Sequence, residues 1–247
     1  MLLAVGGVAL RLGLTDAALS YVKAGLQIPL TVTGVILLVL GANAVLRAFR
    51  ESDSSALDHA PVDAEGHAVT LDDGHGHGLN GPTVAWLLTL PLLALLLIAP
   101  PPLGSFAAAR QSDVQPVSTQ STYPPLQPPV NGAVDLTFSE FVFRALYDPE
   151  RSLEGQRVRL VGFVSATETA AGDYEVSRFI ISCCAADGQA ITVAVADPQP
   201  PPPVDTWLEL EGIWQAPPKA DVPETTTRPT LQVQMRTQIP APTQPYE

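Results

Sequence analysis

QRVRLVGFVSA, residues 156–166, decides the fold of the C-terminal half of this chain. Two sets of residues alternate along this stretch. One set is apolar apart from a glycine (Val158, Leu160, Gly162, Val164), and the other begins with two arginines (Arg157, Arg159, Val161, Phe163). Successive side chains of a β-strand point to opposite faces, so this period of two predicts a strand with one face in a core.

Four further strand-like runs follow it, at residues 173–184, 190–196, 206–214 and 229–235. Glycine, proline and aspartate separate the runs, as expected at strand boundaries. Five short strands with glycines that permit strong coiling predict a small five-stranded OB-like β-barrel, for which a small open sheet is the alternative. The proline-rich run 197–205 is expected to be a loop where such barrels often carry a helix.

One short helix is predicted before the barrel strands. Thr137 and Glu140 form the Thr-x-x-Glu pattern of a capping box. Apolar residues then follow at helical spacing over 138–147. Asp148 ends the helix, because a residue that precedes a proline, here Pro149, avoids the helical conformation.

Two long apolar stretches precede this domain. Residues 24–46 carry no charged side chain, and residues 84–100 include WLLTLPLLALLLIAP. About 20 apolar residues in a helix cross a bilayer, so both stretches are predicted transmembrane helices. Residues 1–14 are shorter and contain Arg11; they are interpreted as a partial first span, with a short buried or surface-lying helix as the alternative. The expected class is an α+β membrane protein with two to three N-terminal transmembrane helices.

The basic residues near the first long span predict the orientation. Arg47 and Arg50 follow it, and the positive-inside rule places them in the cytoplasm, although Lys23 and Arg11 argue weakly for the reverse. The protein is therefore expected in the cell membrane, multi-pass, with its C-terminal domain extracytoplasmic. The predicted segments are a membrane region 1–50, an acidic cytoplasmic loop 51–82, a transmembrane helix 83–100, a Pro-rich linker 101–133, the barrel domain 134–238 and a disordered tail 239–247.

Charge and motif content exclude several classes of function. The net charge is −12, and from residue 132 onward sixteen acidic side chains face eight basic ones, so nucleic acid is not an expected partner. The barrel domain contains no histidine, and the chain has no phosphate-binding glycine loop or His-Glu-x-x-His pattern. No catalytic residue and no enzymatic activity are therefore predicted.

The only two cysteines of the chain are adjacent, within RFIISCCAADG at residues 178–188. In a continuous strand Cys183 and Cys184 point to opposite faces, so both can bind one ion only if the strand ends or bulges there; the AADG that follows predicts an end. A disulfide between neighbours is strained and is not the expected state. Two interpretations stay open. One cysteine packs as a small hydrophobe, or one or both thiolates form a site with Asp187 that suits zinc or cuprous copper.

All four histidines fall in the acidic loop, at His59, His67, His75 and His77. The local run DDGHGHG places Asp72 and Asp73 beside two of the imidazoles. Imidazole with carboxylate is a competent ligand set for Zn²⁺ or Ni²⁺, and short His-rich tracts often capture metals transiently. The alternative is a solvated, disordered loop without a metal.

Three segments resemble one family: ALRLGLTDAALSYVKAGLQIPLTVTGVILLVLGA, WLLTLPLLALLLIAPPPLGS and above all RFIISCCAADGQAITVAV. They are similar to the YcgQ-type bacterial membrane proteins, which are regarded as subunits of a two-gene permease. The resemblance implies a YcgR-type polytopic permease as partner, itself similar to efflux permeases for metals or metalloids. The positions that match the family motif are Arg178, Ile180, Cys183, Cys184, Ala186 and Asp187.

The resulting hypothesis is a membrane-anchored accessory subunit of a permease in transition-metal or metalloid transport or homeostasis. Neither long span contains a charged residue, so the chain is not expected to form the transport pathway itself. The alternative is an envelope structural or interaction protein whose barrel binds a protein or glycan without a metal. A thiol-redox role ranks below both, because Arg178 is the one basic neighbour of the cysteines in the sequence.

Overall fold

The computed structural model describes residues 1–54, 90, 101–111, 122–167, 174–217 and 228–247. The chain divides into two compact units, residues 1–17 with 27–100 and residues 18–26 with 101–247. The predicted helix 83–100, apart from Leu90, and the acidic loop from residue 55 onward lie outside the described residues. Those two predictions therefore stay predictions.

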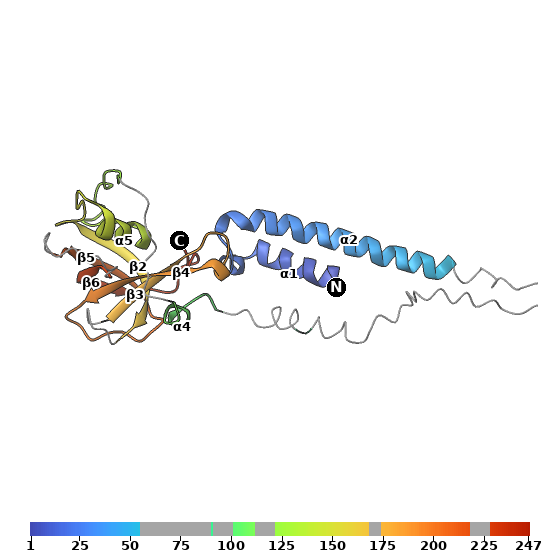
Figure 1. The fold of residues 1–247 in the computed structure, drawn as a ribbon. Coiled ribbons are helices and arrows are strands. Elements are labelled where there is room, and N and C mark those ends of the chain that lie inside the picture. Colours follow the sequence, from blue (N-terminus) through green and yellow to red (C-terminus); the bar gives the residue numbers. More distant parts are fainter. Residues whose placement is uncertain (55–89, 91–100, 112–121, 168–173, 218–227) are drawn as a thin grey trace, which may run out of the picture. The chain divides into compact units, whose positions relative to one another are not determined.

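The first unit contains two packed helices, α1 (Leu2–Leu14) and α2 (Gln27–Ser54) (Figure 1). Glycines set how closely they approach. A Cβ atom on Gly34 would lie 2.7 Å from the backbone nitrogen of Leu10, and one on Gly6 would lie 2.9 Å from that of Leu38. No larger residue fits at either position, and such small-residue contacts are typical of helices that pair in membranes.

One helix among the described residues is long and apolar enough to cross a membrane, and it covers Ala24–Arg50. Because it lies near the N-terminus, length and composition identify it equally as a membrane span or a signal sequence. Helix α1 has 13 residues, and at 1.5 Å per residue a helix of that length is roughly 20 Å long. That is shorter than the bilayer core of about 30 Å.

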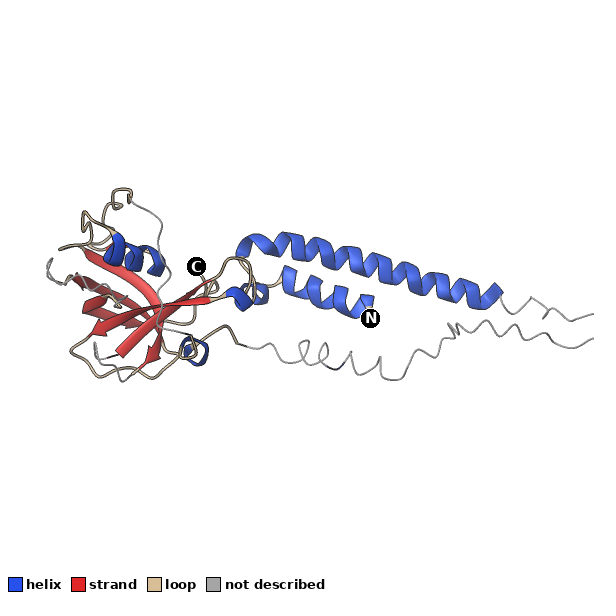
Figure 2. Cartoon of the chain, viewed as in Figure 1, coloured by secondary structure: helices blue, strands red, loops and turns tan. Residues whose placement is uncertain are grey.

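The second unit contains a five-stranded mixed β-barrel with an extra strand (Figures 1 and 2). Strands β2 to β6 follow the order β2-β3-β4-β6-β5, and β5 pairs back onto β2 to close the barrel. Strands β4 and β6 are parallel, and β1 adds to β2 in parallel outside the barrel. The elements are β1 Val134–Asp135, α5 Phe138–Tyr147, β2 Arg157–Ala166, β3 Tyr174–Ile180, β4 Gln189–Ala196, β5 Trp207–Gln215 and β6 Thr230–Gln238.

The alternation in 156–166 places one set of side chains in the barrel core, as predicted. Val158, Leu160 and Val164 are buried in the main core, where Leu160 lies opposite Leu210 of β5. Gly162 occupies the remaining inward position, where a Cβ would lie 2.8 Å from the Phe138 ring of α5. The five predicted strands are all present, but β3 ends at Ile180, earlier than the predicted end at residue 184, and β6 extends to Gln238.

Helix α5 has the predicted bounds and covers the barrel core with Phe138 and Phe141. The Thr137 hydroxyl accepts a hydrogen bond from the Glu140 N–H (3.1 Å), as a cap should. The Glu140 carboxylate does not reach back to Thr137. It binds the buried Arg144 side chain instead (2.9 Å), so half of the predicted capping box forms.

The prediction of a disordered tail at 239–247 is wrong for its last residues. Tyr246 is buried in a second apolar cluster on the outer face of the barrel, with Phe163, Phe179, Ile181 and Trp207. The Glu247 N–H donates to the carbonyl of Phe179 (2.9 Å), and the Tyr246 ring lies edge-on to the Phe179 ring. One aromatic side chain anchors a segment whose average composition indicates disorder.

The linker prediction for 101–133 also needs correction. Residues 105–108 form a short helix, α4 (Ser105–Ala108), and Leu103 packs against the second cluster. Farther along, Leu126 packs against the main core, and the carbonyl of Pro124 accepts from Arg144 (2.7 Å). Scattered apolar side chains thus attach the described parts of this proline-rich segment to the barrel.

The loop 197–205 contains no helix, as predicted, and begins at the buried Asp197, which forms an ion pair with Arg236. The Asp197 carboxylate accepts from the Tyr174 hydroxyl (2.9 Å) and from the Arg236 guanidinium (2.8 Å), and its side chain is 0% exposed. These bonds join β3, β6 and the start of the loop. They lie next to the short parallel pairing of β4 with β6, which covers only three residues of each strand, 194–196 and 230–232.

We predict that Asp197→Ala destabilises the barrel by roughly 3 kcal/mol, because it leaves the buried Tyr174 hydroxyl without its acceptor and the half-buried Arg236 guanidinium without its carboxylate partner. Urea unfolding followed by tryptophan fluorescence measures the change. Glu150→Ala, which removes an exposed carboxylate, is the control and should stay within about 0.5 kcal/mol of wild type. Equal stability of both variants would contradict the structural role of Asp197.

Candidate metal centre

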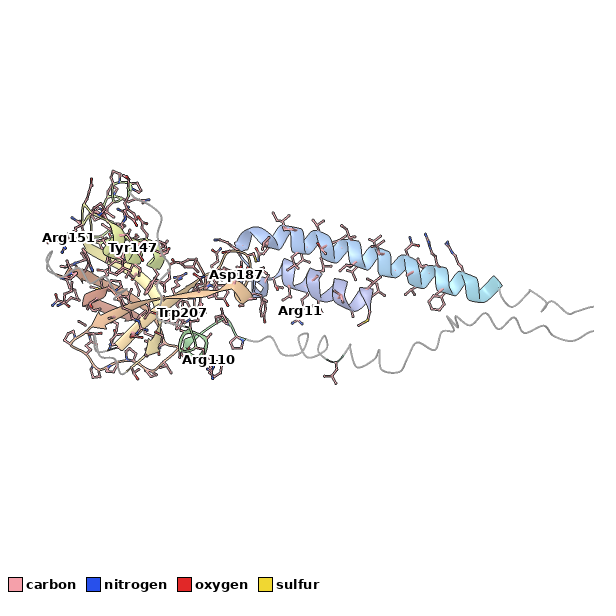
Figure 3. All side chains as sticks on the ribbon, viewed as in Figure 1. Arg11, Arg110, Tyr147, Arg151, Asp187 and Trp207 are labelled. Atoms are coloured by element: carbon pink, nitrogen blue, oxygen red, sulfur yellow. The ribbon has the colours of Figure 1, made fainter. Side chains whose placement is uncertain are left out.

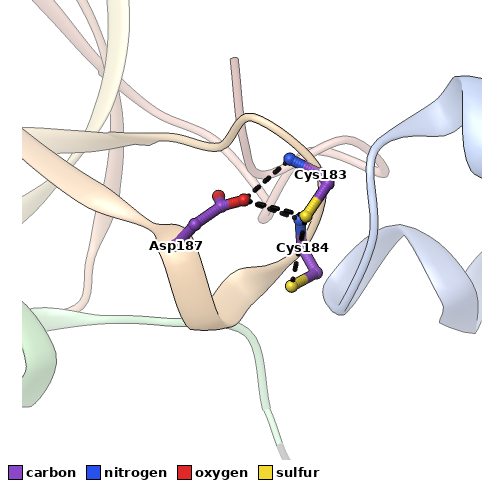
Figure 4. Close-up of side chains that lie close together, drawn as sticks. All are labelled: Cys183, Cys184 and Asp187. Atoms are coloured by element: carbon purple, nitrogen blue, oxygen red, sulfur yellow. Dashed lines mark hydrogen bonds between the residues drawn. The ribbon is translucent and has the colours of Figure 1, made fainter.

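The cysteine pair lies in a tight turn after β3, and Asp187 organises that turn (Figure 4). Its carboxylate accepts hydrogen bonds from the backbone N–H groups of Ser182 (2.8 Å), Cys183 (2.9 Å) and Cys184 (3.4 Å). A strand cannot direct three successive N–H groups to one acceptor, since its N–H groups alternate in direction. The strand therefore ends before the cysteines, earlier than the AADG sequence predicted.

The turn brings three ligand-type atoms together. The two sulfurs are 3.6 Å apart, and the Cys183 Sγ donates to Asp187 Oδ2 at 3.0 Å. One ligand atom from each of Cys183, Cys184 and Asp187 lies within 4.8 Å of the others. Cys183 is exposed, Cys184 is half-buried, and neither is in a disulfide. The interpretation that one cysteine packs as a small hydrophobe can therefore apply to Cys184 but not to Cys183.

Hydrogen bonding shifts the pKa values of Asp187 and Cys183 in opposite directions. The bond from the Cys183 thiol, followed by the backbone N–H groups, lowers the pKa of Asp187 to about 2. The same bond to Asp187, followed by that to Cys184, raises the pKa of the Cys183 thiol to about 11. At neutral pH the turn thus holds a carboxylate and a protonated Cys183. The Asp187 anchor is present above the ordinary carboxylate pKa and is lost as the pH falls through about 2.

A second chain segment holds the cysteine turn from outside; we call residues 18–26 the strap. The Lys23 N–H donates to the carbonyl of Cys183 (3.1 Å), and the Ala185 N–H donates to the carbonyl of Tyr21 (2.7 Å). The strap and the turn thus pair like two short strands. The candidate span begins at Ala24, so the residue just before it is bonded to the cysteine turn.

The tail fixes the strap in turn. The Tyr246 hydroxyl donates to the carbonyl of Ser20 (2.9 Å) and accepts from the N–H of Leu103 (2.9 Å). Sequence reasoning missed these positioning residues, because Ser20 and Tyr246 are 226 positions apart and no local pattern marks either.

The other residues of the motif do not join the sulfur cluster. Arg178 donates to the carbonyl of Gln244 (3.0 Å) and lies 3.6 Å from the Glu247 carboxylate, so it holds the tail. Burial lowers the pKa of its guanidinium, and Glu247 opposes that shift. Ile180 packs against the barrel core, and Ala186 lies in the turn η4 (Ala185–Asp187).

The second predicted metal set lies outside the described residues. It comprises His59, His67, His75, His77, Asp72 and Asp73.

The cysteine turn occupies the end of the barrel domain opposite to Arg151 (Figure 3).

A separate cleft of about 770 Å³ lies beside β2, β3 and β5. Charged side chains of both signs line it, and its arginines have acidic partners: Arg159 binds Asp135 (2.6 Å), and Arg178 faces Glu247. The volume lies within the range of small-molecule pockets.

Comparison with known proteins finds a family match for the barrel domain but no function. Residues 132–247 match the family described as the DUF1980 C-terminal domain. No curated protein and no solved structure matches the chain. The matched region contains the barrel, the cysteine turn and the tail, so the strap is the part of the candidate centre that lies outside it.

We predict that Asp187→Asn lowers the pKa of the Cys183 thiol toward its ordinary value, because the thiol loses its anionic acceptor. The measurement is the pH dependence of iodoacetamide alkylation in a Cys184→Ser background, where the Cys183 thiol is the one thiol left. At pH 7.5 the substitution should accelerate alkylation. Asp135→Asn, remote from the turn, is the control and should leave the profile unchanged. An identical profile for Asp187→Asn would show that the thiol–carboxylate bond is absent in solution.

Proposed function

We propose that this protein is a membrane-anchored accessory subunit of a permease that handles a transition metal or metalloid, and that Cys183, Cys184 and Asp187 hold the ion. The observation that carries the proposal is the convergence of two sulfurs and a carboxylate oxygen within 4.8 Å. Two thiolates with one carboxylate make a soft donor set that favours zinc or cuprous copper over magnesium or calcium.

The spacing of the sulfurs fits a tetrahedral ion. Two thiolates bound at about 2.3 Å to tetrahedral zinc lie about 3.8 Å apart, and the two sulfurs are already 3.6 Å apart. Asp187 is ionised at neutral pH, so binding requires the cysteine protons to leave and little movement of the backbone. Three protein ligands leave a position open for a donor from a partner or for water, as in an exchangeable site.

The membrane part of the proposal rests on the candidate span and its flanks. Residues 24–46 have no charged side chain, and Arg47 and Arg50 follow them, which favours a span with the barrel outside the cytoplasm. A second span at 83–100 would make the protein multi-pass. Apolar side chains of α2, among them Ile28, Val32 and Val39, are exposed and available to lipid or to a membrane partner.

The permease partnership extends the resemblance to the YcgQ-type proteins. An accessory role agrees with the absence of ionisable residues between Gln27 and Leu46, since a transport pathway normally needs them. In this proposal the partner conducts the ion, and the barrel binds it outside the membrane. The acidic loop with its histidines would capture metal on the cytoplasmic side.

A finer description of the barrel supports a second candidate function. We propose that it is of the OB type, because five strands close with one parallel pair, as in a Greek-key barrel. OB barrels often bind ligands on one outer face, and the 770 Å³ cleft lies on such a face. An envelope protein that binds a peptide or glycan in this cleft, without a metal, is the alternative function.

Zinc titration of the reduced full-length protein tests the ion site. We expect binding of one Zn²⁺ at the barrel, and a loss of affinity greater than about 100-fold in Cys183→Ser/Cys184→Ser, since both sulfur ligands are gone. Simultaneous replacement of the four histidines by alanine is the control that keeps the barrel site. The metal role would be refuted if the reduced wild-type protein bound no Zn²⁺. It would also be refuted if, in the background with all four histidines replaced, the double serine variant bound Zn²⁺ as tightly as the protein with both cysteines.

Affinity purification tests the partner. Coexpressed with a YcgR-type permease, the chain should copurify with it in mild detergent. Replacement of residues 1–17 and 27–50 by unrelated apolar helices, with the strap 18–26 kept, should abolish the association. Capture that survives this replacement would move the contact to the barrel. No capture by the intact chain would remove the permease partnership.

A further inference from the structure

The two thiols are close enough to react with each other. Their sulfurs are 3.6 Å apart, and a disulfide bond of about 2.05 Å therefore needs a relative shift of roughly 1.5 Å. Cys183 is exposed and Cys184 is half-buried, so a small thiol reagent reaches the pair. The chain has two cysteines in total, which leaves each with the other as its one intramolecular partner.

Most of the hydrogen bonds that hold the turn do not involve sulfur. A disulfide removes the S–H donor of Cys183, but Asp187 also accepts from the backbone N–H groups of Ser182 and Cys183. The strap contributes two further backbone bonds, from Lys23 and to Tyr21. None of these backbone bonds depends on the oxidation state of sulfur.

Adjacency makes such a disulfide easy to reduce. Neighbouring Cα atoms are about 3.8 Å apart across a trans peptide, whereas ordinary disulfides join Cα atoms about 4.4–6.8 Å apart. Ring closure between neighbours is therefore strained, and strained disulfides are the readily reduced ones. Outside the cytoplasm, two cysteines farther apart could form an unstrained and stable disulfide. An adjacent pair can form only a strained disulfide, so it returns readily to the dithiol.

We propose that Cys183 and Cys184 form a reversible oxidation site that opens and closes the ion site. A disulfide of low molecular weight, RSSR, is the oxidant. One cysteine sulfur attacks RSSR, forms a mixed disulfide and releases RSH; the second sulfur displaces the other RS group as RSH and closes the ring. The protein loses two protons and two electrons, and RSSR gains them as two RSH. Two thiols of a reductant reverse the step through the same intermediate.

The consequence for the ion rests on the proposed function. The ring has no thiolate to offer, so of the three donors only Asp187 keeps its charge. Oxidation then releases the ion, and reduction restores the site. The strain of the ring sets the dithiol as the prevailing form in a weakly oxidising environment.

Oxidised glutathione, added to the reduced full-length protein in detergent, tests the proposal. The reaction is quenched with N-ethylmaleimide and read by intact and peptide mass. The wild type should lose two hydrogens in the 178–188 peptide, carry no glutathione and no maleimide, and regain both thiols with reduced glutathione. Cys184→Ser should stop at a glutathione adduct on Cys183, and Cys183→Ser should be the reciprocal control.

The outcomes separate this proposal from the metal role. Lasting glutathione adducts on both cysteines, a disulfide-linked dimer in place of the ring, or a ring that reduced glutathione cannot open would each overturn the oxidation site. Zinc titration of the same samples should show at least a tenfold weaker affinity after oxidation. If reduced protein closes the ring but binds no Zn²⁺, the oxidation site stands and the proposed function fails.

Discussion

The Asp187 carboxylate is the interaction on which the candidate centre depends. By accepting from the N–H groups of Ser182 and Cys183, it ends strand β3 at Ile180, three positions before the first cysteine, and turns both sulfurs to one side. A continued strand would have placed the sulfurs on opposite faces of the barrel wall. The same carboxylate is also the third ligand-type group of the cluster, so the anchor of the turn and the oxygen donor are one residue.

Tyr246 has a comparable role for the surroundings of the centre. Its ring is buried against Phe179 on the outer face of the barrel, and its hydroxyl bonds to the backbone at Ser20 and Leu103. The strap before the candidate span and the segment that leads into α4 therefore meet at one side chain of the tail. The strap links the tail to the cysteine turn, because Tyr246 bonds to Ser20 while Lys23 and Tyr21 bond to the turn.

Much of the barrel follows from local pattern, and much of the centre does not. The period of two in 156–166 and the cap at Thr137 are short-range properties, and both give the predicted elements. AADG indicated that the strand ends after Cys184, but β3 ends at Ile180, because the Asp187 carboxylate folds back on the preceding N–H groups. The tail and the proline-rich segment were predicted as unpacked, because composition averages out single anchors such as Tyr246 and Leu126.

The sequence alone determined that apolar helices precede a small β domain, and that two adjacent cysteines and an aspartate stand at the end of its second long strand. Periodicity and hydrophobic length are properties of neighbouring residues, so they need no tertiary information. Only the tertiary structure decided that the two sulfurs converge with Asp187, and that the strap and the tail hold them there. Those contacts join residues far apart in the chain, and they form because burial of Tyr246 and closure of the barrel bring the segments together.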